Sequence, residues 1–120
     1  MSLLWVADSF YVGVNDVAAA SSWYIEKLGL KKTTVELDDG EDRVALVFTK
    51  ELSAPIVLGP STAHSDQTTR MLYTDAIQKA REWLSSRGVR VGAIEKDRQG
   101  THYFEMQDLE GNVIEVSEEP

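Results

Sequence analysis

The side chains able to bind a metal or relay a proton are few in this chain of 120 residues, which has two histidines and no cysteine. His102 lies in "THYFEM" and Glu115 in "NVIEV", two segments whose residue types indicate strands. If the two side chains face each other, the carboxylate favours the protonated imidazole and keeps it charged to higher pH. Each residue has an alternative interpretation as a partly exposed strand position.

The second histidine, His64, lies in the polar stretch "STAHSDQ", residues 61–67, where a surface position is expected. The lack of cysteine excludes disulfides, thiolate metal ligands and a cysteine nucleophile. A catalytic metal site usually needs about three protein donors. Any such site here would have to be built from carboxylates and imidazoles.

The charge balance limits the partners. Twelve basic residues against twenty acidic ones give a net charge of −8, which repels a phosphate backbone and excludes nucleic acid as a partner. Acidity would instead concentrate a cationic small molecule, although the same carboxylates can simply form a solvated surface. The start, "MSLLWVADSF", lacks the features of a signal peptide, and no apolar run has the length of a membrane helix. We expect a soluble, cytoplasmic protein with no membrane partner.

These residues must be positioned by regular elements, and the first half of the chain indicates five. "FYVGV", residues 10–14, is expected to be a strand that ends at the helix-capping residues Asn15 and Asp16. A helix follows and ends at Gly29. Strands are expected in "KKTTVEL" and "RVALVFTK", which flank the turn "DDGED", and in "APIVLG". The apolar face of the predicted helix consists of Val17, Ala20, Tyr24, Ile25 and Leu28.

The second half repeats this β-α-β-β-β order. "TTRMLYT" is expected to be a strand that ends at the capping residues Thr74 and Asp75, followed by a helix up to Gly88. "VRVGAIEK", "THYFEM" and "VIEVS" are the strands that follow. Ile77, Ala80 and Leu84 form the second apolar stripe, with Trp83 beside it.

The spacing of caps and stops indicates an internal duplication. Asp16 precedes Gly29 by thirteen residues and Asp75 precedes Gly88 by thirteen, so the pattern recurs at an offset of 59 residues, from 16 to 75. We expect one domain over residues 1–120, with module one at about residues 5–60 and module two at about residues 67–117. The fold class is α+β: two βαβββ modules forming a curved mixed sheet around a central cleft.

The element order, "WYIEKLGL" at residues 23–30 and "DLEGNVIEV" at residues 108–116 together resemble the vicinal oxygen chelate superfamily, also known as the glyoxalase, bleomycin resistance protein and extradiol dioxygenase superfamily. The resemblance covers nearly the whole chain. It implies the glyoxalase/bleomycin resistance fold. In metal-dependent relatives, four ligands from the first and last strand of each module hold a divalent cation, and the cation polarises neighbouring oxygens of the substrate. The resemblance implies the same arrangement here.

The ligand positions that the resemblance implies are poorly occupied. The first-strand ligand precedes the helix-capping aspartate by seven residues, which places it at Ser9, and the 59-residue offset places its counterpart at Thr68. Neither residue type suits a divalent transition metal. The last strand of module one, "PIVLG", offers no donor, so only Glu115 matches a ligand position. No metal ligand set is assigned, and no catalytic residue is identified.

Strand alternation predicts the lining of the cleft. If Phe10, Val12 and Val14 pack under the first helix, the opposite parity faces the cleft, and the 59-residue offset carries this assignment to the second module. The residues then expected to face the cleft are Ser9, Tyr11, Gly13, Thr68, Arg70, Leu72, Val113, Glu115 and Ser117. From these, and with His102, we select Ser9, Tyr11, Thr68, Arg70, His102 and Glu115 as candidate ligand-binding residues. Arg70 would suit a carboxylate or be neutralised by Glu115.

Two classes of function are weighed against each other, and a degenerate domain retained for interaction is a third possibility. The favoured one is a small-molecule-binding protein without a metal cofactor, similar to bleomycin resistance proteins, with antibiotic sequestration as one form and a cationic compound as one class of ligand. The alternative is a lyase, isomerase or dioxygenase that depends on a divalent metal ion held by other donors, including residues of a second subunit. The resemblance also implies a homodimer.

Overall fold

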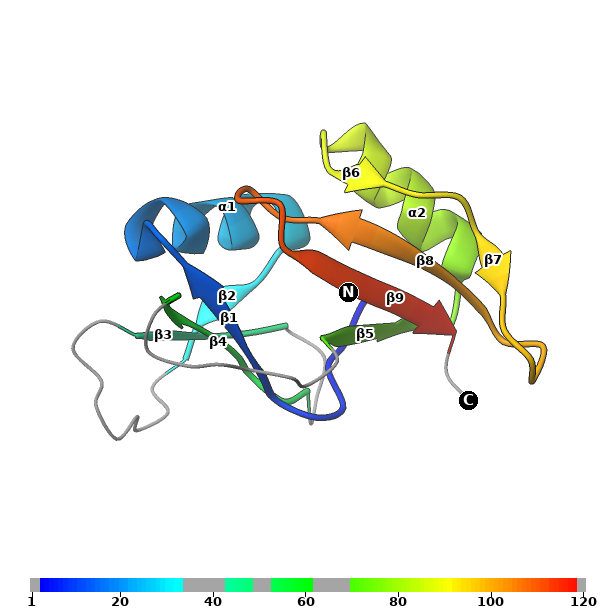
Figure 1. Cartoon of the computed structure of the whole chain (residues 1–120), viewed down its shortest axis with the longest axis horizontal. Coiled ribbons are helices and arrows are strands. Elements are labelled where there is room, and N and C mark those ends of the chain that lie inside the picture. Colours follow the sequence, from blue (N-terminus) through cyan, green and yellow to red (C-terminus); the bar gives the residue numbers. More distant parts are fainter. Residues whose placement is uncertain (1–2, 34–42, 49–52, 62–69, 119–120) are drawn as a thin grey trace.

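The computed structural model describes residues 3–33, 43–48, 53–61 and 70–118. It confirms the predicted α+β fold: each half of the chain forms its own mixed sheet, and both helices lie on the same side of the sheets (Figure 1). The predicted turn "DDGED" and the strand residues that follow Thr33 lie outside the described residues. Neither described helix has the length and apolarity that crossing a bilayer demands.

Module one is a four-stranded sheet ordered β1-β4-β3-β2. β1 (Phe10–Val14) and β4 (Ile56–Pro60) are parallel, β3 (Val44–Val47) is antiparallel to β4, and β2 (Lys31–Lys32) forms the edge. α1 (Val17–Leu28) begins where predicted, because the Asp16 carboxylate accepts from Ala19 N at 3.0 Å. It ends at Gly29, whose φ of 75° is readily adopted only by glycine.

Module two has the strand order β5-β9-β8-β6. β5 (Met71–Thr74) is parallel to β9 (Val113–Glu118), and β8 (His102–Gln107) is antiparallel to β9. Two short strands, β6 (Arg90–Val91) and β7 (Glu95–Lys96), pair with β8.

The predicted Asp75 cap of α2 (Ile77–Ser86) is wrong. The residue at the cap position is Ala76, and its backbone amide donates a hydrogen bond to Thr74 Oγ1 at 3.1 Å.

The offset between the modules is 60 residues over the first strand and the helix of each module, and the predicted offset of 59 is wrong there. Buried Val12 and Leu72, Ala20 and Ala80, and Tyr24 and Leu84 are each 60 apart. A slip of one residue moves a strand's side chains to the opposite face. Leu72, expected in the cleft, is therefore fully buried in the core.

The N-terminal segment, residues 4–6, joins the two sheets. Trp5 exchanges two backbone hydrogen bonds with Tyr73 of β5, at 3.0 and 2.8 Å, and Val6 O accepts from Ala54 N at 2.8 Å. Leu4 and Val6 are completely buried in a core that contains residues of both modules. The modules therefore share one hydrophobic interior.

A buried carboxylate ties the turn after β8 to α1. Asp108 is 7% exposed and accepts from the amides of Glu110 and Asn112 and, at 2.7 Å, from the Tyr24 hydroxyl. Burial, and then the Asp108 carboxylate, raise the pKa of Tyr24 well above its usual value, so the phenol remains a donor. On the same turn, Glu110 accepts from the amides of Asn15 and Asp16 at 2.7 and 3.0 Å.

The helices also meet at their C-terminal ends. Arg87, just after α2, donates to the carbonyls of Glu26 and Lys27 in the last turn of α1, and its guanidinium lies 4.8 Å from the centre of the Trp83 ring. The last carbonyls of a helix lack partners within it and carry partial negative charge. Arg87 therefore fastens α2 to the end of α1.

We predict that Tyr24→Phe lowers the free energy of unfolding by about 1–2 kcal/mol, because Asp108 loses a buried donor while the ring volume is kept. Urea unfolding followed by circular dichroism measures the change. The control is Tyr103→Phe, which removes a hydroxyl that has no hydrogen bond in the described structure and should change stability little. Equal stability of the two variants would contradict the role given to Asp108.

Candidate functional site

The candidate site is the open face, by which we mean the face of each sheet turned away from α1 and α2. Strand alternation assigns it, because Val12, Leu58 and Leu72 point toward the core. The pairing register then places the opposite residues together on the other face. Its members are Tyr11, Gly13, Ala45, Val57 and Gly59 in module one, and Met71, Tyr73, Tyr103, Glu105, Glu115 and Ser117 in module two.

In module one, the Tyr11 ring covers the backbone of β4. Its hydroxyl donates to Pro60 O at 2.8 Å, and the Arg43 guanidinium lies 5.5 Å from the ring centre. A β-carbon on Gly59 would overlap the Tyr11 hydroxyl, so glycine is what allows the ring to lie flat there. Tyr11 is only 8% exposed, so in module one this face is a packed aromatic layer with a cation beside it.

In module two, the open face is acidic. Glu115 is half-buried and pairs across the strands with Glu105 on one side and Met71 on the other. Burial, then the charges of Glu105 and Asp97, raise the pKa of Glu115. Glu95 in the first place, and also Glu115 and Glu105, raise the pKa of Tyr103. This part of the face therefore has a negative potential that a cation would relieve.

The arrangement considered for His102, in which it faces Glu115, is not the one found in the structure. His102 pairs across the strands with Lys96 and contacts Glu118, with Nδ1 at 2.9 Å from Oε1 and the His102 amide donating to the same oxygen at 2.7 Å. The His102 amide, and then its ring, lower the pKa of Glu118. His102 has the strand parity of Phe104 and lies beside the start of α2, whereas Glu115 has the opposite parity.

The remaining candidates lie apart. Ser9 is exposed ahead of β1, and its hydroxyl donates to Pro55 O at 2.7 Å. Arg70 precedes β5, where its Nε donates to Val113 O at 3.1 Å and its charge partly offsets the raised pKa of Tyr24. Thr68 and His64 lie outside the described residues. Among the described candidates, only a backbone bond from Glu115 N to Arg70 O joins two of them.

Seven residues of the open face were missed from the sequence: Ala45, Val57 and Gly59 in module one, and Met71, Tyr73, Tyr103 and Glu105 in module two. A signal for β5 was present, since the apolar stripe Val17, Ala20 and Tyr24 recurs at Ile77, Ala80 and Leu84 with an offset of 60. That offset places Met71 at the position in module two that is equivalent to Tyr11 in module one. The pairing of Glu105 with Glu115 depends on the register of β8 and β9, which the separate strands do not specify.

The donors on the open face do not fit the metal site of metal-dependent relatives. Within the described parts of the chain, no group of three His, Cys, Asp or Glu side chains converges as a metal would require. Ser9 offers a hydroxyl that is already bonded to a carbonyl, and Glu105 and Glu115 together supply two carboxylates where about three protein donors are needed. No chemical step through a metal is therefore derived.

The family model described as the Glyoxalase/Bleomycin resistance protein/Dioxygenase superfamily matches residues 3–116. The chain belongs to this superfamily. No curated protein matches the chain in sequence. The family assignment therefore rests on nearly the full length of the chain and agrees with the βαβββ-type order of the two modules, in which the strand predicted over residues 89–96 of module two is split into β6 and β7.

Solved structures show the same fold. A member of the superfamily from Sphaerobacter thermophilus has 25% identity and a TM-score of 0.76, with 94% of this chain and 96% of that chain covered. TnmS3, an antibiotic binding protein from Streptomyces sp. CB03234, has 22% identity and a TM-score of 0.75 over 96% and 95% of the two chains. A lactoylglutathione lyase from Agrobacterium tumefaciens has 19% identity and a TM-score of 0.64 over 92% and 90%.

We predict that Glu105→Gln lowers the pKa of Glu115, because one of the charges that raise it is removed. Because the pKa of Glu115 is raised in the folded state, protonated Glu115 stabilises the fold relative to ionised Glu115. This contribution to the free energy of unfolding is present at low pH and is lost as pH rises through the folded pKa. NMR titration of the Glu115 side chain measures the shift. Glu82→Gln, on the exposed side of α2, is the control and should leave the Glu115 pKa unchanged.

We further predict that Gly59→Ala destabilises the fold by about 1–3 kcal/mol, because the new methyl group displaces the Tyr11 ring. Thermal unfolding measures the change. The effect should shrink in a Tyr11→Ala background, where the ring is gone. Gly92→Ala is the control, since a β-carbon there meets only ordinary contacts, with Glu105 O at 3.6 Å. An undiminished effect in the Tyr11→Ala background would contradict the clash.

Proposed function

We propose that this chain is a small-molecule-binding protein of the glyoxalase/bleomycin resistance type that works without a metal cofactor and binds its ligand on the open face. The observation that carries the proposal is the make-up of that face: aromatic rings and adjacent carboxylates, without three converging metal donors among the described residues. Such a surface offers shape, stacking and charge, which suit capture of a molecule more than Lewis-acid chemistry.

The charges of the open face favour a cationic, partly aromatic ligand. Glu105 and Glu115 are cross-strand neighbours whose mutual repulsion contributes to the raised pKa of Glu115, and a bound cation would reduce that repulsion. Tyr73 and Tyr103 lie on the same face and provide rings against which a flat cation packs. The net charge of −8 would also draw a cation toward the protein.

A similar fold in an antibiotic binding protein supports the proposal, because it shows that this architecture serves to bind a drug in at least one protein. Antibiotic sequestration is therefore one form that the proposed function can take. The cytoplasmic location and the homodimer remain predictions from the sequence.

A panel of compounds tests the proposal. We expect flat aromatic cations to raise the melting temperature of the purified protein, and their anionic counterparts to leave it unchanged. The double variant Glu105→Gln, Glu115→Gln should weaken cation binding about tenfold or more, because it removes charged partners of the ligand. Glu82→Gln is the matched control. Isothermal titration calorimetry measures the affinities.

Elemental analysis separates this function from the metal-dependent alternative. The purified protein should contain less than stoichiometric zinc, nickel, manganese and iron by inductively coupled plasma mass spectrometry. The proposal would be overturned if the wild-type protein contained stoichiometric metal and had lyase, isomerase or dioxygenase activity, and if Glu115→Ala lost both.

A further inference from the structure

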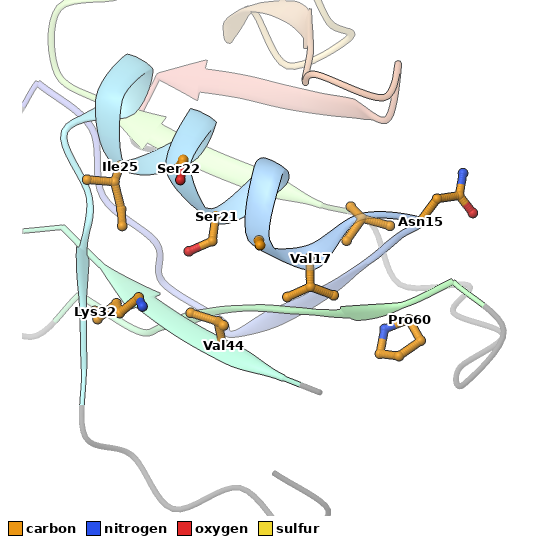
Figure 2. A pocket seen from close by; sticks show the side chains of 10 residues that line it. Asn15, Val17, Ser21, Ser22, Ile25, Lys32, Val44 and Pro60 are labelled. Carbon is orange, nitrogen blue, oxygen red and sulfur yellow. The ribbon is translucent and has the colours of Figure 1, made fainter. Parts of the chain in front are cut away.

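A groove lies between α1 and the sheet of module one, on the side opposite the open face. It has a volume of about 630 Å³, within the range of small-molecule sites. α1 forms one wall, and residues of β2, β3 and β4 form the other (Figure 2). The apolar part of the lining includes Val14, Val17, Ile25, Val44 and Pro60.

The Ser21 hydroxyl is a buried polar group without a partner in this groove. Ser21 is 4% exposed, and its Oγ has no hydrogen bond in the described structure. A serine within a helix can satisfy its hydroxyl with the carbonyl four residues earlier, but this one does not. Figure 2 shows the hydroxyl directed from α1 toward the strands. An unsatisfied buried hydroxyl costs stability that a hydrogen-bonding ligand would recover.

Module two shows the same position filled. Arg81 is 60 residues from Ser21, the offset that relates the buried residues of the two helices, and its Nε donates to Gly92 O at 2.7 Å. The long side chain of Arg81 thus bridges α2 to the chain after β6. In module one, a small serine at the equivalent position leaves the corresponding space open.

The charge of the groove is opposite to that of the chain. Lys32 is its charged lining residue, no carboxylate lines it, and in the described structure Lys32 has no ion pair. In Figure 2 the Lys32 side chain lies on the strand side of the groove, opposite Ile25, while Val44 lies opposite Ser21. In a chain with net charge −8, a positive lining selects anions.

We propose that this groove binds a small monocarboxylate with an apolar body. Val17, Ile25 and Val44 would enclose the apolar body, the Ser21 hydroxyl would donate to the carboxylate, and Lys32 would neutralise its charge. This site is separate from the open face and does not depend on the function proposed there.

Octanoate is the probe, with octanamide and octylamine as its neutral and cationic analogues. We expect octanoate to bind with chemical-shift changes confined to α1, β2, β3 and β4 in ¹H–¹⁵N NMR spectra, and the amide to bind at least threefold more weakly. Lys32→Gln should weaken the binding of octanoate roughly threefold to tenfold, because the charge-assisted contact is lost. Lys31→Gln, the neighbouring residue of β2 that is likewise exposed but does not line the groove, is the matched control and should bind as the wild type does.

Two changes at Ser21 test the hydroxyl and the space separately. Ser21→Ala should raise the melting temperature, because the unpartnered hydroxyl is removed, and weaken octanoate binding. Ser21→Leu should fill the groove and abolish binding, while Ala19→Leu, on the exposed side of α1, should not.

Absence of octanoate binding at millimolar concentration, or equal binding in Lys32→Gln, Ser21→Leu and wild type, would overturn the inference. Cation binding by the open face would survive that failure, because Glu105 and Glu115 lie outside the groove.

Discussion

The relative position of the two modules depends on one buried carboxylate, that of Asp108. A charge placed away from water is costly unless its acceptor positions are filled. Here the amides of its own turn and the Tyr24 hydroxyl of α1 fill them. Because these partners come from both modules, neither the turn nor the helix can shift without leaving the carboxylate short of donors. A polar contact thus specifies an arrangement that hydrophobic burial alone would leave loose.

Further polar contacts extend this constraint along α1. Glu110 of the same turn accepts from the amides at the start of the helix, and Arg87 after α2 bonds the carbonyls at its end. α1 is therefore held at its beginning, middle and end by residues of module two. Both helices consequently lie on the same side of the sheets (Figure 1), and the opposite faces are left for other uses.

The open face carries negative charge and the groove on the helix side carries positive charge, because alternate residues of a strand point to opposite faces of the sheet. Glu105 and Glu115 come from neighbouring strands and meet because the register pairs them. On the helix side, the charge of the groove comes from Lys32 at a sheet edge, and its depth comes from a serine where module two has Arg81. Duplication supplied the same scaffold twice, and substitutions at equivalent helix positions gave the two halves different surfaces.

Local signals in the chain determined the elements and the family. Asp16 and Gly29 bound the first helix because a cap oxygen and a positive φ act within a few residues. The apolar stripes predicted which side of each helix is buried, and the order of elements together with the segments at residues 23–30 and 108–116 indicated the superfamily. The presence of Tyr11 and Glu115 on strands of a binding fold was likewise accessible from the sequence alone.

Tertiary structure decided which residues meet. Equal Asp-to-Gly spacings suggested an offset of 59, but the helices differ in length and the packed positions are 60 apart, so Leu72 lies in the core and Met71 and Tyr73 lie on the open face. The partner of His102 is Glu118, and the neighbour of Glu115 is Glu105, because the register of β8 and β9 is set by how the whole sheet packs. The groove beside Ser21 was also decided by tertiary structure, because its size depends on how the side chains of α1 and of the facing strands pack against each other.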